Sequence, residues 1–95
     1  MDKDFNLAAA KAAVKAAYKK YELATKYAYA VNGQATDALE ALVAAIANNN
    51  PYVDNFKGAY ESAKYRADAA WDEYTVARDS AAETEAIYKA AAELN

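Results

Sequence analysis

The chain has 95 residues, of which 56% are hydrophobic and 28 are alanine, and its formal net charge is −3. It contains no cysteine and no histidine, which excludes disulfides, thiolate or imidazole metal sites and histidine-dependent nucleophilic catalysis. Two glycines and one proline leave few places for turns, so the composition favours long helices with few connections. A single all-α domain over residues 1–95 is predicted.

The first predicted helix covers about residues 4–32. Its apolar and small residues recur three and four positions apart, which is the spacing of a helix face that packs on another helix. We call such a row of residues a seam. Gly33 has the residue type favoured just after a helix end, so this helix is predicted to stop there. The seam consists of Leu7, Ala10, Val14, Ala17, Tyr21, Ala24, Ala28 and Val31.

A short second helix is predicted over about residues 36–48. Thr36 can cap its N-terminus, and the acidic residues of its first turns suit the positive end of a helix. The run Asn48–Asn49–Asn50–Pro51 must end it, because the residue before proline avoids the helical conformation. Its predicted buried residues are Leu39, Leu42, Val43 and Ile46.

The third predicted helix covers about residues 51–94, with Asn50 as its cap. Two forms of this helix are open. It is either continuous or kinked at Asp79–Ser80, because Ser80 and Glu83 have the spacing of a capping box. Its seam runs through six heptads and combines alanine with tyrosine, as in a coiled coil. The seam consists of Val53, Phe56, Tyr60, Ala63, Ala67, Ala70, Tyr74, Ala77, Ala81, Thr84, Tyr88 and Ala91.

Three helices of these lengths predict an up-down-up bundle with a short middle helix. At 1.5 Å per residue, the helices would be roughly 40, 20 and 65 Å long, so the third would extend beyond the first. Its far half would then be covered by a second copy, which is the form predicted, by another protein, or by a bend of the helix back on itself at Ser80. Residues 1–33 carry six lysines against three acidic residues, and residues 34–95 carry five basic against eleven acidic residues, which favours pairing between the two parts.

Large aromatic and aliphatic side chains dominate protein–protein contacts, so they are the predicted contact residues. Tyr74 and Tyr88 are the expected anchors on the far half of the third helix. Other tyrosines lie on flanks or outward rows, where no core needs them. The complete set of predicted interface residues is Tyr27, Tyr29, Tyr65, Trp71, Tyr74, Ile87, Tyr88 and Leu94.

The remaining chemistry of the sequence favours a protein without an active site. No catalytic, metal or cofactor-binding residues are predicted, because the carboxylates fall mainly on solvent-facing rows and no glycine-rich loop is present. A lysine stripe, Lys11, Lys15 and Lys19, could follow nucleic-acid phosphates, but the acidic net charge disfavours this. The opposite alternative is mimicry of nucleic acid by an acidic face made of Glu61, Asp68, Asp72 and Asp79.

The sequence therefore predicts a non-enzymatic helical protein–protein interaction or assembly module that associates with itself. The alternative is a small regulator or inhibitor that docks on a larger protein. The first residues show no basic stretch followed by an apolar one, and the longest apolar run, 41–47, is too short for a bilayer. A cytoplasmic protein without membrane contact is expected.

Overall fold

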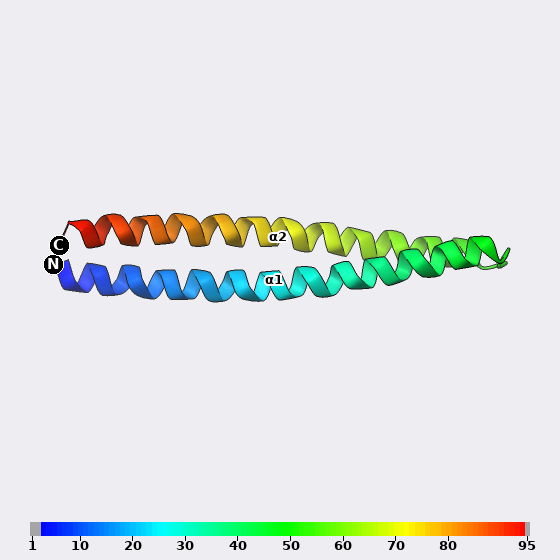
Figure 1. Ribbon diagram of the computed structural model, residues 1–95, viewed down its shortest axis with the longest axis horizontal. Helices are drawn as coiled ribbons and strands as arrows, with labels where there is room; N and C mark the ends of the chain where they lie inside the picture. The colour runs from blue at the N-terminus through cyan, green and yellow to red at the C-terminus, as the bar shows by residue number, and fades with distance from the viewer. Residues whose placement is uncertain (1–2, 95) are drawn as a thin grey trace. The chain divides into compact units, whose positions relative to one another are not determined.

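A computed structural model describes residues 3–94, and the regular elements in that range are two α-helices. Helix α1 is Lys3–Ala47, with 45 residues, and helix α2 is Val53–Glu93, with 41 residues (Figure 1). The all-α prediction is confirmed. The three-helix bundle is wrong, because the predicted first and second helices are one continuous helix.

The error in the prediction lies at Gly33. No glycine among the described residues has a positive φ, so Gly33 is an ordinary helical residue and does not end the helix. A glycine inside a helix costs about 1 kcal/mol relative to alanine, which is a weak signal for a helix end. The seam of α1 continues through this point without a change of spacing, with Ala35, Ala38, Leu42 and Ala45 buried or half-buried. Burial of this continuous seam outweighs the local cost.

The seams predicted for the first and third helices are confirmed. Each of their residues, from Leu7 to Val31 and from Val53 to Ala91, is buried or half-buried. Together with the continuation to Ala45, both helices keep one heptad spacing over nearly their whole described length. This spacing is the one that lets two helices remain in contact along their seams.

The connection between the helices follows the predicted break at the asparagine cluster. Asn49 adopts a left-handed conformation with φ of 51°, which asparagine tolerates better than most residues. The Asn50 N–H donates to the Ala45 carbonyl at 2.9 Å, and the Asn49 N–H donates to the Ile46 carbonyl at 3.2 Å. These two bonds form a Schellman motif that satisfies the last carbonyls of α1. The cluster therefore ends α1 as predicted.

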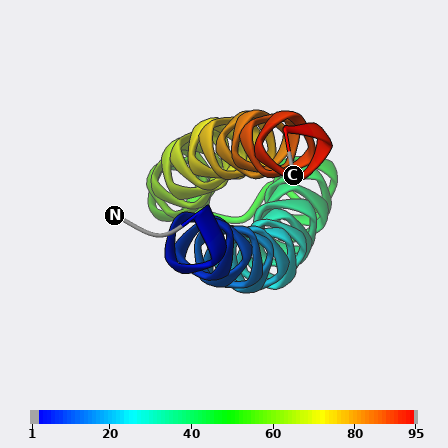
Figure 2. The same ribbon diagram turned by 90° about the vertical axis from the view of Figure 1, so that its left-hand side faces the viewer.

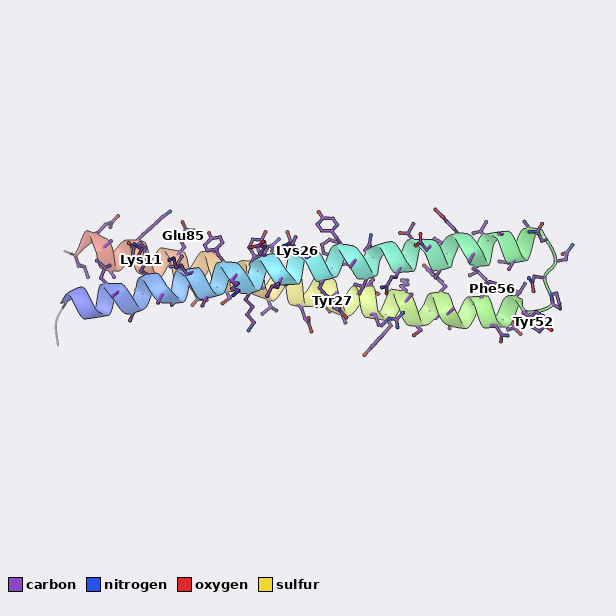
Figure 3. The ribbon with its side chains drawn as sticks, turned by 90° about the horizontal axis from the view of Figure 1, so that it is seen from below. Lys11, Lys26, Tyr27, Tyr52, Phe56 and Glu85 are labelled. Atoms are coloured by element: carbon purple, nitrogen blue, oxygen red, sulfur yellow. The ribbon has the colours of Figure 1, made fainter. Side chains whose placement is uncertain are left out.

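Helix α2 begins at Val53, slightly later than predicted. The Asn50 side chain accepts a hydrogen bond from the Tyr52 N–H at 2.8 Å, and the Tyr52 carbonyl accepts from the Phe56 N–H at 3.3 Å. Figure 3 shows Tyr52 at the connection and Phe56 at the start of α2. Helix α2 is continuous through Ser80, where the Thr84 hydroxyl donates to the Ser80 carbonyl at 2.6 Å. The structure therefore has the continuous form of this helix and not the one kinked at Asp79–Ser80.

Contacts divide the chain into two units. Unit 1 combines the part of α1 up to Thr25 with the part of α2 from Glu73 onward, and unit 2 is Lys26–Asp72, which includes the connection. Figure 2 looks at the ends of the helices in unit 1, where α1 begins and α2 ends. The predicted uncovered half of the last helix is thus wrong, since residues from Glu73 onward pack on α1 of the same chain.

The buried residues of the described chain are almost all alanine. No polar or charged residue is buried, and no side chain is large and fully buried at the same time. Larger seam residues such as Tyr21, Tyr60 and Phe56 are half-buried. A methyl side chain removes little apolar area from water, so each seam position contributes modest hydrophobic stabilisation. The buried residues are Ala28, Val31, Ala35, Ala45, Ala63, Ala67, Ala70, Ala77 and Ala81.

Candidate functional site

Many of the large apolar side chains of this protein lie at its surface. The aromatic and aliphatic residues that are exposed come from both helices and from the connection, and their exposed fractions range from 41% to 78%. Single exposed apolar residues are common in proteins, but here they accompany a core without any large side chain. The exposed residues are Tyr18, Leu23, Tyr27, Tyr29, Leu39, Val43, Ile46, Tyr52, Tyr65, Val76, Ile87 and Leu94.

Three of these residues form a continuous row on α1 in unit 2, which we call the α1 apolar stripe. Leu39, Val43 and Ile46 are spaced by four and three residues and are 41%, 57% and 56% exposed. They were predicted to be buried, together with Leu42. That prediction is wrong for the stripe and holds only for Leu42, which is half-buried. The heptad counted without interruption from the first seam would have placed Leu42 inward and the stripe outward.

Tyr74 packs against α1 within unit 1. The rings of Tyr21 and Tyr74 have centroids 5.5 Å apart at 48°, and their hydroxyl oxygens are 3.4 Å apart. That oxygen distance is long for a hydrogen bond between hydroxyls, so ring packing is the main interaction. The Arg78 guanidinium carbon lies 6.0 Å from the centroid of the Tyr74 ring. Tyr74 therefore belongs to the seam inside the chain.

A second aromatic contact lies in unit 2. Trp71 is half-buried, and its ring meets the Tyr29 ring edge-on, with centroids 5.4 Å apart at 77°. Tyr29 itself is 65% exposed, so this pair is at the surface. An exposed aromatic pair offers a rigid apolar contact to another molecule.

The other predicted interface residues fall into two groups. Tyr88 is half-buried on the α2 seam, whereas Tyr27, Tyr65, Ile87 and Leu94 are exposed. The contact of all eight predicted residues with a partner stays a prediction. Tyr74 and Tyr88 serve the seam, and the exposed members are better placed to meet another molecule.

A hydrogen bond between Tyr18 of α1 and Glu85 of α2 links the two helices in unit 1. The Tyr18 hydroxyl donates a hydrogen bond to the Glu85 carboxylate, and Lys89 lies 3.3 Å from the other carboxylate oxygen. The hydrogen bond from Tyr18, followed by Lys89, lowers the pKa of the Glu85 carboxyl group. The same bond raises the pKa of the Tyr18 hydroxyl. Both groups are at the surface, where such a contact contributes little energy.

Other kinds of site find no support in residues 3–94. No group of three or more histidine, cysteine, aspartate or glutamate side chains gathers closely enough there to hold a metal ion. Neither helix, over its described length, is long and apolar enough to cross a membrane. The chain matches no family model, no curated protein and no solved structure. Its surfaces are therefore the basis for assigning a function.

Proposed function

We propose that this protein is a non-enzymatic helical interaction module that associates with further copies of itself through the outward faces of its helices. The observation that carries this proposal is the distribution of apolar side chains. Among the described residues, the buried ones are alanines and Val31, whereas twelve large apolar side chains remain exposed. A domain that is complete by itself normally buries its large apolar residues first.

The exposed area supports the same proposal. The chain exposes 6942 Å². A folded monomer of 10.3 kDa typically exposes about 5,400 Å² by the size relation for globular proteins. A standard protein–protein interface buries about 1,600 Å² in total, or about 800 Å² on each partner, so one such contact would remove about half of the excess. Two such contacts on each copy would bring the exposed area of this chain close to the usual range.

The residue types present also favour binding over catalysis. The chain has no histidine or cysteine to act as a base or thiolate nucleophile. The pKa shifts of Tyr18 and Glu85 arise from an exposed hydrogen bond, which is a common structural cause and not a sign of an acid–base centre.

Light scattering after size separation tests the proposal directly. We expect a mass of at least twice 10.3 kDa at micromolar concentration, with a helical circular dichroism spectrum. The mass should fall on dilution if the association is reversible. A helical chain that keeps the monomer mass over the whole concentration range would contradict self-association.

The α1 apolar stripe favours a second candidate, a small regulator that docks on a larger protein. The stripe holds three exposed aliphatic side chains spaced by four and three residues, as on the apolar face of an amphipathic helix. This candidate predicts a monomer whose stripe is open to small apolar probes. Fluorescence of such a dye should fall in the double variant Val43→Lys, Ile46→Lys. The matched variant Gln34→Lys, Ala41→Lys adds the same charge outside the stripe and should leave the signal unchanged.

A further inference from the structure

Two outward patches of opposite charge have the same spacing on the two helices. The basic patch on α1 consists of Lys15, Lys19, Lys20 and Leu23. Each member has a counterpart 53 residues later on α2, and these counterparts form the acidic patch. The acidic patch consists of Asp68, Asp72, Glu73 and Val76.

The match between the patches includes the apolar residue as well as the charges. In both, three like charges precede one aliphatic side chain by eight, four and three residues. These spacings place all four side chains on one side of a helix. Because each patch lies on one continuous helix, its geometry follows from that helix alone.

Both patches are exposed. Leu23 is 58% exposed and Val76 is 69% exposed. The six charged residues are exposed too, and within residues 3–94 none of them takes part in an ion pair. Ala16 and Ala69 lie seven residues before the aliphatic residues and are also exposed. Their small side chains would let another helix approach closely.

The direction of the patches follows from the seam of unit 1. Tyr21 and Tyr74 face each other at the seam, and Leu23 and Val76 follow them by two positions. Two residues turn a helix by about 200°, so each aliphatic residue points away from the seam on its own helix. Leu23 and Val76 therefore do not meet across the seam of unit 1, whereas Lys20 and Glu73, one position before the tyrosines, lie beside that seam.

Building on the proposed self-association, we propose that the basic patch of one copy binds the acidic patch of the next. Leu23 packs on Val76 at the centre of this contact, and the lysines pair with the carboxylates around it. Complementary charges of this kind fix the partner and the register of helices. The occupant of each patch is thus a second copy of this chain.

The contact joins two different surfaces, so it leaves one basic and one acidic patch free at the ends of any pair. Such head-to-tail contacts form rings if the rotation between copies closes, and open rows if it does not. In low salt, we expect the measured mass to rise with protein concentration to values above that of a dimer. Raising the salt from about 0.02 M to about 0.5 M should lower this mass, because exposed charges are screened.

Charge reversal of one patch at a time tests the contact. Like charges facing each other should raise the dissociation constant more than about tenfold, so each variant should run at or near the monomer mass. The basic-patch variant is Lys15→Glu, Lys19→Glu, Lys20→Glu. The acidic-patch variant is Asp68→Lys, Asp72→Lys, Glu73→Lys.

The decisive experiment mixes the two variants in equal amounts. In the basic-patch variant both patches are acidic, and in the acidic-patch variant both patches are basic. Association should therefore return in the mixture and remain absent from each variant alone. Circular dichroism of each variant shows that the helices remain formed. A variant that loses its helices is replaced by the single changes Lys19→Glu and Asp72→Lys, which follow the same logic.

Three results would overturn the inference in distinguishable ways. If the wild type associates and both variants keep its mass, the patches are not the contact, and the proposed function stands. If both variants become monomeric and the mixture stays monomeric, charge pairing between unlike patches is excluded. A wild type that is monomeric in low salt removes the contact and self-association together.

Discussion

At the scale of single residues, the two glycines affect stability only through the helices that contain them. Gly33 and Gly58 both lie inside helices, and a methyl group added at either would meet no atom within 4 Å. Neither position needs the conformational freedom of glycine, because neither has a positive φ. Both glycines therefore only weaken the helices that contain them.

Replacing Gly33 with alanine should stabilise the protein. The free energy of unfolding is expected to rise by about 0.5–1 kcal/mol, because alanine loses less backbone entropy in a helix. Thermal or urea unfolding followed by circular dichroism measures the change, and Gly58→Ala is the matched case on α2. A helix end at Gly33 with a left-handed glycine would instead make the alanine variant less stable.

The Tyr18–Glu85 contact predicts a stability difference confined to a window of pH. The lowered pKa of Glu85 means that its contribution is present above its ordinary value of 4.5 and is lost as pH falls through the folded pKa. The raised pKa of Tyr18 means that its contribution is present below 10.0 and is lost as pH rises through the folded pKa. Tyr18→Phe should therefore melt slightly below the wild type near pH 7.

Melting temperatures of both proteins across pH measure this difference, which should vanish toward strong acid and strong alkali. The control is Tyr27→Phe, which removes the hydroxyl of another exposed tyrosine on α1. A difference in melting temperature that is equally large at all pH values would contradict this prediction. It would show that the two proteins differ in the packing of the ring and not in the hydrogen bond.

At the scale of elements, heptad spacing predicted most of the fold. The residues that form both seams could be named from the sequence because period alone decides which side chains share a face. A helix end at Gly33 would start a new heptad register in the segment that follows. The prediction for that segment is wrong because the register of α1 continues through Gly33. The cost of a helical glycine is local, whereas the burial that offsets it comes from α2, distant in sequence. The exposed position of Leu39, Val43 and Ile46 could not be derived until that competition was decided.

Ala70 gives the sharpest test of the seam. It is 1% exposed, so Ala70→Leu should force three extra carbon atoms into a filled contact and destabilise the protein by about 1–3 kcal/mol. Ala86 on the same helix is exposed and lies outside both charged patches, and Ala86→Leu should change stability by less than about 0.5 kcal/mol. Urea unfolding of both variants provides the comparison. Equal stabilities would mean that the two alanines are in similar surroundings.

At the scale of the whole molecule, the chain has two long helices, a core of small residues and a surface with many large apolar ones. The sequence predicts both seams correctly. The predicted need for a partner, however, depends on the lengths of three helices, and the structure has two. The argument for association now depends on exposed side chains and matched charges, which only the structure places. Leu23 and Val76 each follow a seam tyrosine by two positions, so their outward direction follows once the structure has confirmed both seams.

Association predicts that thermal stability depends on protein concentration. Because partners bind the folded chain, the melting temperature should rise as the concentration increases from about 1 to about 100 µM. Circular dichroism in cells of different path length measures this, and the acidic-patch variant is the control expected to show no dependence. A wild-type melting temperature independent of concentration would argue for a chain that folds and melts alone.

The position of the connection at Asn48–Tyr52 has a consequence for the order in which the chain acquires its structure. The two helical segments of unit 2 are joined by this short connection, whereas Tyr21 and Tyr74 are 53 residues apart and Tyr18 and Glu85 are 67 apart. Closing a longer loop costs more entropy, so pairing should start beside the connection and proceed toward the chain ends. On the ribosome, the whole α1 seam is made before its partner exists. The N-terminal turns, which wait longest, are rich in lysine, whose charge opposes aggregation, and in alanine, which has a low β-propensity.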